Sequence, residues 1–191
     1  MRNIVLASAS PRRRDLLSML EIGPFSVCPA MGGEKPPETD SPEEIVRALA
    51  EAKAREVAAR SGPDALVIAA DTIVCCDREV LGKPRDEEDA FRMLRLLSGR
   101  SHEVWTGLCL MDRSGPVCEA EKTLVFFREL DDEEIRRYIQ TGEPMDKAGA
   151  YGIQGKASLF VRAIEGDYFN VVGLPLCRLG LMLGAKGVSL L

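Results

Sequence analysis

The amino-terminal stretch MRNIVLASASPRRR, residues 1–14, decides how the rest of the chain can fold. The apolar run IVLA at residues 4–7 is typical of a short buried strand. Ser10 is then a good N-cap, and Pro11 takes the first helical position, where its missing N–H is not needed. The stretch therefore predicts a strand that ends in a serine-rich turn and leads directly into a helix.

The turn between this strand and this helix is suited to bind an anion. Unpaired backbone N–H groups and the positive end of the helix dipole meet around Ser8 and Ser10. Arg12, Arg13 and Arg14 follow in the first helical turn, where positive side chains oppose that dipole. A bound anion would remove the conflict, and arginine is well shaped for bidentate contacts with phosphate. We therefore predict a phosphate-binding turn; the alternative is a solvated basic patch on an exposed helix.

The composition is that of a globular protein, with 46% hydrophobic and 29% charged residues among 191. We expect a single domain over residues 1–191. A net charge of -5 argues against a general nucleic-acid or membrane-surface binder. No apolar run reaches the roughly 18 residues of a membrane span, and no leader pattern is visible, so we expect a cytoplasmic protein.

Histidine and cysteine usage narrows the chemistry further. His102 is the only histidine, which excludes a multi-histidine metal site and leaves little room for a Ser-His-Asp triad. We expect a structural or surface role for it. The six cysteines form no C-x-x-C pattern, so we expect buried, reduced thiols.

Helices alternate with strands along the first half of the chain, and a long hairpin follows. The pattern predicts strands over residues 4–7, 24–29, 66–76, 103–111, 117–127 and 159–164, and helices over 11–20, 42–60, 86–97, 131–139 and 175–183. Because the strands on either side of residues 112–115 form a hairpin, we predict an α/β protein with a mixed, twisted sheet flanked by helices. The length of the hairpin favours two lobes with a central cleft.

Two charged residues break the apolar pattern of their own elements. Asp71 interrupts the run LVIAADTIVCC at residues 66–76. A strand buried on both faces holds a carboxylate only with a cation, a metal ion or a raised pKa. We predict a functional acid; the alternative is an aspartate at a bulge, bonded to backbone N–H groups. Lys53 falls on the apolar stripe of the helix over 42–60, so its ammonium either points into the cleft or snorkels to the sheet edge.

Two loops provide further candidates for ligand-binding residues. Lys83 stands in the constrained turn GKP, although surface lysines are common. The segment DKAGAYGIQG, residues 146–155, has three glycines at three-residue spacing but does not follow a strand, so it is not a dinucleotide fingerprint. A loop that holds Tyr151 and Gln154 could pack flat against a nucleobase, with the Gln154 amide reading its polar edge. The alternative is an ordinary compact loop.

Seven short motifs, in order along nearly the whole chain, resemble the Maf family of nucleoside triphosphate pyrophosphatases. They are SASPRR at residues 8–13, ADT at 70–72, GKP at 82–84, LSGRSH at 97–102, GEP at 142–144, DKAGAYGIQG at 146–155 and VVGLP at 171–175. The YGIQG segment resembles the subgroup that acts on dTTP and UTP, not the one that prefers 7-methylguanosine triphosphate.

The resemblance implies an ITPase-like fold, a homodimer, and a house-cleaning reaction that needs Mg²⁺ or Mn²⁺ and converts a nucleoside triphosphate to the monophosphate and pyrophosphate. It implies that Asp71 is the proton acceptor. The chemistry of a carboxylate leaves three roles open for this residue: it takes the proton of the attacking water, ligates the metal ion, or does both. The other positions that the resemblance implies for substrate or metal are Arg12, Arg13, Glu34, Lys53, Thr72, Lys83 and Gln154. Among these, Arg12, Thr72 and Gln154 match positions associated with substrate choice. Ser8 and Ser10 join the substrate-binding candidates because they form the anion-binding turn.

One departure from the family pattern concerns the loop before Glu34. The family usually has two or three acids there, whereas MGG precedes Glu34 in this chain, so the metal-ligand role of Glu34 is the weakest part of the resemblance. Two alternatives follow: a nucleotide-binding regulator of cell division and septum formation with low turnover, and a pyrophosphatase specific for 7-methyl-GTP. Gln154 argues against the second.

Overall fold

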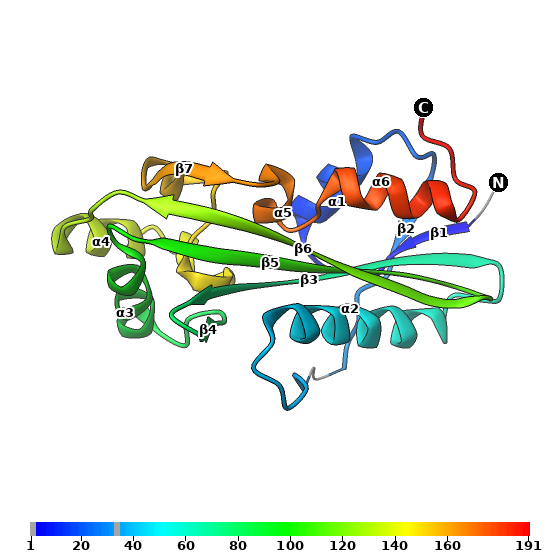
Figure 1. Cartoon of the computed structure of the whole chain (residues 1–191), viewed down its shortest axis with the longest axis horizontal. Coiled ribbons are helices and arrows are strands. Elements are labelled where there is room, and N and C mark those ends of the chain that lie inside the picture. The colour runs from blue at the N-terminus through cyan, green and yellow to red at the C-terminus, as the bar shows by residue number, and fades with distance from the viewer. Residues whose placement is uncertain (1–2, 33–34) are drawn as a thin grey trace. The chain divides into compact units, whose positions relative to one another are not determined.

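The computed structural model describes residues 3–32 and 35–191, and Figure 1 shows the course of the chain. The chain forms two compact units. The first comprises Met1–Asp71, Thr106–Glu121 and Gly173–Leu191, and the second comprises Thr72–Trp105 and Lys122–Val172. None of the described helices is long and apolar enough to cross a membrane.

The described strands form one mixed sheet, as the sequence predicted. Its strand order is β2-β1-β3-β5-β6-β7, and β4 pairs with β3 off this path. Strand β1 pairs in parallel with β2 and β3, whereas β4 pairs antiparallel with β3 and β7 antiparallel with β6. The strands are β1 (Asn3–Leu6), β2 (Phe25–Val27), β3 (Ala65–Cys76), β4 (Glu79–Leu81), β5 (Ser101–Asp112), β6 (Gly115–Phe127) and β7 (Val161–Glu165).

The helices agree with the sequence pattern in number and place, with one addition. They are α1 (Pro11–Ser18), α2 (Pro42–Ala58), α3 (Glu87–Leu97), α4 (Asp132–Ile139), α5 (Tyr168–Val172) and α6 (Leu176–Ala185). Ser41, Asp86 and Asp131 accept N-cap hydrogen bonds at the starts of α2, α3 and α4. The short α5 is absent from the prediction because its five residues are too few to show helical periodicity.

The first unit packs α2 on one face of its sheet and α1 and α6 on the other (Figure 1). The apolar stripe of α2 includes Val46, Ala50 and Val57, all fully buried. Helix and sheet approach so closely that a Cβ at Gly107 of β5 would lie 2.1 Å from the carbonyl oxygen of Val46. Only glycine fits at this crossing, because a methyl group would overlap the helix backbone.

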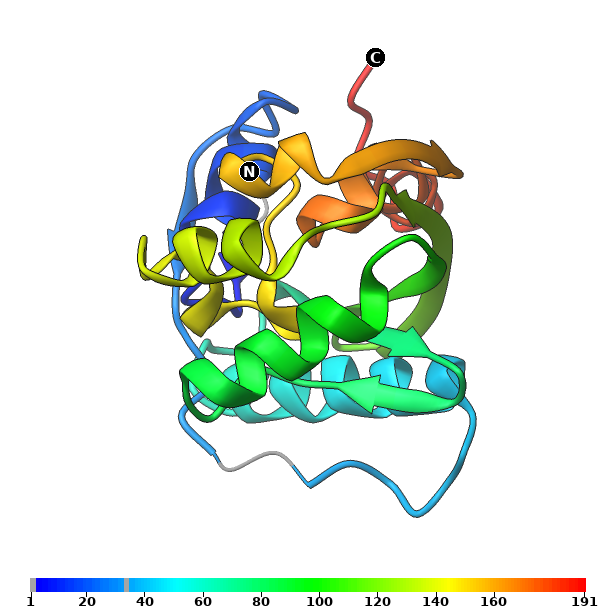
Figure 2. The same cartoon turned by 90° about the vertical axis from the view of Figure 1, so that its left-hand side faces the viewer.

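The second unit has its own core, built around aromatic side chains. Helices α3 and α4 turn their buried faces toward Phe127 and Phe160. The rings of Phe127 and Tyr151 meet edge to face at 4.8 Å between centroids. In Figure 2, turned by 90° from Figure 1, α3 (green) and α4 (yellow-green) lie on the side that faces the viewer. The predicted strand over 159–164 begins later, at Val161, because a 3-10 helix occupies Lys156–Leu159.

Candidate functional site

The serine turn has the geometry that its sequence predicts. Strand β1 ends at Leu6, and Ser10 caps α1 by accepting the Arg13 backbone N–H at 3.4 Å. The Ser10 backbone N–H donates to the hydroxyl of Ser8, 3.2 Å away. Pro11 is the first helical residue, and no acidic side chain lies in the first turn of the helix. This turn therefore combines helix-end N–H groups with arginine side chains, as an anion site requires.

Of the three arginines, Arg13 is the one held across the turn. Its Nε donates to the carbonyl oxygen of Gly173 at 2.7 Å, and its Nη1 lies 3.5 Å from the Ser8 hydroxyl oxygen. Arg12 and Arg13 are half-buried. Arg14 points to solvent and pairs with Asp15 at 3.4 Å. This arginine therefore fits the alternative interpretation of the sequence, a solvated basic patch on an exposed helix.

Lys53 and Asp71 form a largely buried ion pair in the first unit. The Lys53 Nζ lies 2.5 Å from Oδ1 of Asp71, and their side chains are only 14% and 13% exposed. The lysine therefore turns inward from α2 instead of snorkelling to solvent. The carboxylate that interrupts β3 has the cationic partner that its burial demands.

The serine turn follows the carboxyl end of β1, and Asp71 lies within the neighbouring strand β3, which continues to Cys76. In the parallel pair of β1 and β3, Leu6 lies opposite Ile68, and the Ala7 N–H donates to the Ile68 carbonyl at 2.8 Å. Ser8 follows directly, while Asp71 lies three residues beyond Ile68, or roughly 10 Å along the strand. Ligands of α/β sheets commonly bind outside the carboxyl ends of parallel strands. The serine turn lies at such an end, and Asp71 lies on β3 beyond the last residue that pairs with β1.

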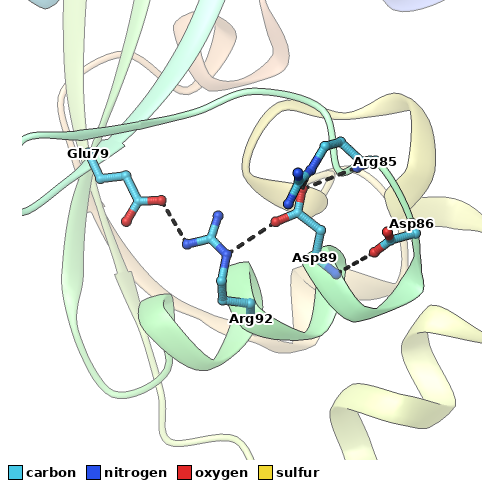
Figure 3. Close-up of polar contacts among 5 residues, drawn as sticks. All are labelled: Glu79, Arg85, Asp86, Asp89 and Arg92. Carbon is cyan, nitrogen blue, oxygen red and sulfur yellow. Dashed lines mark hydrogen bonds and ion pairs between the residues drawn. The ribbon is translucent and has the colours of Figure 1, made fainter.

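In the second unit, Lys83 stands in an exposed loop between β4 and α3. Asp89 fixes this loop, because Oδ2 of its buried carboxylate accepts the backbone N–H and the Nε of Arg85, both at 3.2 Å. Arg92 donates to the same carboxylate at 3.1 Å and to Glu79 at 2.7 Å (Figure 3). The Arg85 hydrogen bonds, from side chain and backbone, lower the pKa of Asp89, so the carboxylate stays charged at neutral pH.

The glycine-rich loop of the second unit carries Gln154 on its exposed side. The Gly149 N–H donates to the Gly82 carbonyl at 3.0 Å, so this loop is tied to the residue before Lys83. A Cβ at Gly149 would lie 2.9 Å from Val74 of β3, two positions beyond Thr72. The loop that carries Gln154 therefore packs against β3 close in sequence to Thr72 and is hydrogen-bonded to the residue before Lys83.

One expectation about this loop is wrong: Tyr151 is not available to a nucleobase. It is 5% exposed, and its hydroxyl lies 2.7 Å from Nε2 of His102. His102 is itself 2% exposed, and burial lowers its pKa to about 3. Within the described residues the Nδ1 of His102 has no hydrogen-bond partner. The structural role expected for this histidine is confirmed, and only the Gln154 side of the loop is left for a ligand.

The candidate residues thus fall into two groups. The first unit holds Ser8, Ser10, Arg12, Arg13, Lys53 and Asp71, and the second unit holds Thr72, Lys83 and Gln154. Glu34 lies outside the described residues, so its predicted metal role stays a prediction. Among residues 3–32 and 35–191 no three Cys, His, Asp or Glu side chains are grouped to hold a metal ion.

Sequence reasoning missed the two acids that anchor the loops of the second unit, Asp89 and Glu143. Asp89 had a signal, because it falls on the buried stripe of α3 that continues with Ala90, Met93 and Leu94. Glu143 was visible only as part of the GEP motif. The cysteines are free thiols, as expected, but only Cys75, Cys76 and Cys109 are buried. Cys28 and Cys118 are half-buried, and Cys177 is exposed.

A family model, sequence relatives and a solved structure are each similar to this chain over most of its length. The family model described as Maf-like protein matches residues 3–186. A protein of Alkaliphilus oremlandii named dTTP/UTP pyrophosphatase is 54% identical over 185 residues, covering 96% of this chain and 95% of its own. A Thermococcus gammatolerans protein of the same name is 57% identical and covers 91% of each chain. The Ham1 protein of Staphylococcus aureus has a similar fold, with a TM-score of 0.54 at 14% identity over 97% of this chain and all of the other.

Proposed function

Since the chain belongs to the Maf family, we propose that it is a nucleoside triphosphate pyrophosphatase that hydrolyses dTTP and UTP to the monophosphate and pyrophosphate. Relatives more than 50% identical over nearly the full chain carry the name dTTP/UTP pyrophosphatase. The observation that carries the proposal for this chain is the buried pair of Lys53 and Asp71, whose strand β3 pairs with the strand that leads into the serine turn. A house-cleaning role in nucleotide metabolism follows from such an activity.

The phosphate-binding part of the reaction belongs to the cationic groups. A triphosphate carries about four negative charges, and hydrolysis at the α-phosphorus is faster when preorganised donors neutralise them. Arg13 suits this role because Gly173 and Ser8 already orient its guanidinium. We propose that Arg12, Lys53 and Lys83, together with the Ser8 and Ser10 turn, supply the remaining donors.

Asp71 suits the role of proton acceptor for the attacking water. Lys53 contacts its Oδ1, so Oδ2 is the oxygen to which a water would donate. A metal ion also fits this residue: Mg²⁺ in nucleotide enzymes is commonly held by one or two carboxylates plus substrate phosphates. We propose that Asp71, with Glu34, holds Mg²⁺ or Mn²⁺, which would supply further charge neutralisation at the phosphates.

Base selection is proposed for Arg12, Thr72 and Gln154. The side-chain amide of Gln154 presents one acceptor and two donors, which suits the carbonyl and N–H groups of a pyrimidine edge. The exposure of Gln154 on an anchored loop supports this role.

The experiment that tests the proposal measures pyrophosphate release from a panel that contains dTTP, UTP, purine triphosphates and 7-methyl-GTP, with Mg²⁺ or Mn²⁺. We expect dTTP and UTP to be the best substrates. Binding of dTTP without pyrophosphate release would favour the regulator of cell division, and preference for 7-methyl-GTP would favour the other subgroup. The homodimer, the cytoplasmic location and the absence of nucleic acid or membrane partners stay predictions.

A further inference from the structure

Glu143 holds the loop segment that carries Gln154. Its Oε1 accepts the hydroxyl of Tyr138 at 3.0 Å, and its Oε2 accepts the backbone N–H of Lys156 at 3.0 Å. Tyr138 belongs to α4, is 4% exposed, and packs edge to face on Phe160 at 5.0 Å between ring centroids. The carboxylate therefore ties the backbone two residues after Gln154 to the core of the second unit.

The glycines of the loop make room for this contact. A Cβ at Gly155 would lie 2.0 Å from Oε1 of Glu143, so only glycine lets the carboxylate reach the backbone at this point. On the other side of Gln154, a Cβ at Gly152 would lie 2.6 Å from Cε of Lys147. Gly152 and Gly155 thus have a packing cause, because charged side chains lie against the backbone on both sides of Gln154.

Lys147 holds the same segment from its other side, and together the contacts of Glu143 and Lys147 form a clamp on the turn that carries Gln154. Its Nζ donates to the Glu143 carbonyl at 2.7 Å and to the Asp146 carboxylate at 2.6 Å, and its side chain is only 13% exposed. The Gly155 N–H donates to the Gly152 carbonyl at 3.0 Å, which closes a four-residue turn. Gln154 occupies the third position of this turn, so its backbone is fixed while its side chain remains exposed.

We propose that Glu143 is a positioning residue for base selection: by clamping the turn at Gly155 and Lys156, it sets the direction in which Gln154 presents its amide. Glu143 itself touches no substrate. This inference rests on the proposed function, because it concerns how the same enzyme distinguishes pyrimidine from purine triphosphates. A site that recognises polar edges by hydrogen bonds loses discrimination when those groups are misplaced.

The test compares Glu143→Gln with wild type. The amide keeps one acceptor oxygen, but its NH₂ group cannot accept a hydrogen bond from Lys156 or Tyr138. We expect the ratio of kcat/KM for dTTP to kcat/KM for dGTP to fall by about 10-fold or more, toward the ratio of Gln154→Ala. The double variant Glu143→Gln/Gln154→Ala should keep the ratio of Gln154→Ala alone, because the two residues act through one contact.

A second readout does not depend on activity. In Glu143→Gln, backbone amide hydrogen exchange at Gly155 and Lys156 should quicken, while exchange in α3 stays unchanged. Tyr138→Phe, which removes only the hydroxyl, should move the selectivity ratio and the exchange rates in the same direction by a smaller amount. The matched control is Glu133→Gln, whose side chain is 81% exposed and pairs with Arg137 on the surface of α4.

The outcomes distinguish a failure of the positioning role of Glu143 from a failure of the proposed pyrophosphatase activity. A folded Glu143→Gln protein with the wild-type dTTP-to-dGTP ratio, or with both kcat/KM values lowered equally, would overturn the positioning role. Unchanged hydrogen exchange at Gly155 and Lys156 would overturn it as well. A wild-type protein that releases no pyrophosphate from any triphosphate would instead contradict the proposed function, while the exchange measurement would still test the clamp.

Discussion

Lys53 Nζ lies 2.5 Å from Oδ1 of Asp71, and the two side chains are almost equally shielded from water, at 14% and 13% exposure. The lysine comes from the buried stripe of α2 and the aspartate from the interior of β3. The Asp71 carboxylate therefore depends on the Lys53 ammonium, because a buried carboxylate needs a compensating positive charge.

The first prediction concerns the stability of this pair. Lys53→Met leaves the Asp71 carboxylate in its buried position without its ammonium partner, so we expect the free energy of unfolding to fall by about 3–5 kcal/mol. Urea denaturation followed by circular dichroism measures this change. The double variant Lys53→Met/Asp71→Asn should recover most of the loss, since no buried charge remains. Additive losses in the double variant would show that the pair is not coupled.

The second prediction concerns the crossing of α2 over β5. Gly107→Ala places a methyl group 2.1 Å from the Val46 carbonyl oxygen, so helix and strand must separate. We expect a loss of about 1–3 kcal/mol in the free energy of unfolding, measured by urea denaturation. The control is Gly180→Ala in α6, where the new methyl would meet Leu190 at an ordinary 3.7 Å. That change should stabilise the helix by up to about 1 kcal/mol; equal effects at both glycines would contradict the packing described.

The third prediction concerns the pH dependence of stability. Burial lowers the pKa of His102 to about 3 in the folded protein. The unfolded chain, with an ordinary histidine pKa near 6.5, therefore binds a proton that the folded protein excludes as the pH falls from about 6.5 to 3. Stability should decline across this window, by about 2 kcal/mol from this residue between pH 7 and pH 5.

The variant His102→Gln isolates this contribution. It keeps a polar partner for Tyr151 but cannot take up a proton, so its stability should change less between pH 7 and pH 5 than that of wild type. Urea denaturation at the two pH values measures the difference. If wild type and variant lose the same stability over this interval, His102 is not the group responsible.

Sequence alone predicted the elements whose signals are local. The Ser10 cap, Pro11 and the arginines that follow define the turn before α1. The breaks in apolar periodicity singled out Asp71 and Lys53 separately, and the structure shows that the two charges pair with each other. In these cases the cause lies in periodicity or in helix-end chemistry, which a linear pattern contains.

The parts that sequence did not predict depend on contacts between distant residues. Tyr151 was expected near a ligand, but the closeness of His102 and Phe127 draws its ring into the core of the second unit. Asp89 and Glu143 anchor loops through hydrogen bonds to backbone N–H groups, and nothing in the residue pattern indicates which N–H a carboxylate will meet. These contacts appear only once the chain has folded.

The measurement that tests the central claim most directly is pyrophosphate release from dTTP by Asp71→Asn, together with dTTP binding to the same protein. Asparagine keeps the shape of the side chain but cannot accept a proton from water. We expect the rate to fall by roughly 10²–10⁴ while dTTP still binds. The control Asp15→Asn, at a 70% exposed acid that pairs with Arg14, should leave the rate unchanged. Turnover by Asp71→Asn near that of wild type would contradict the account.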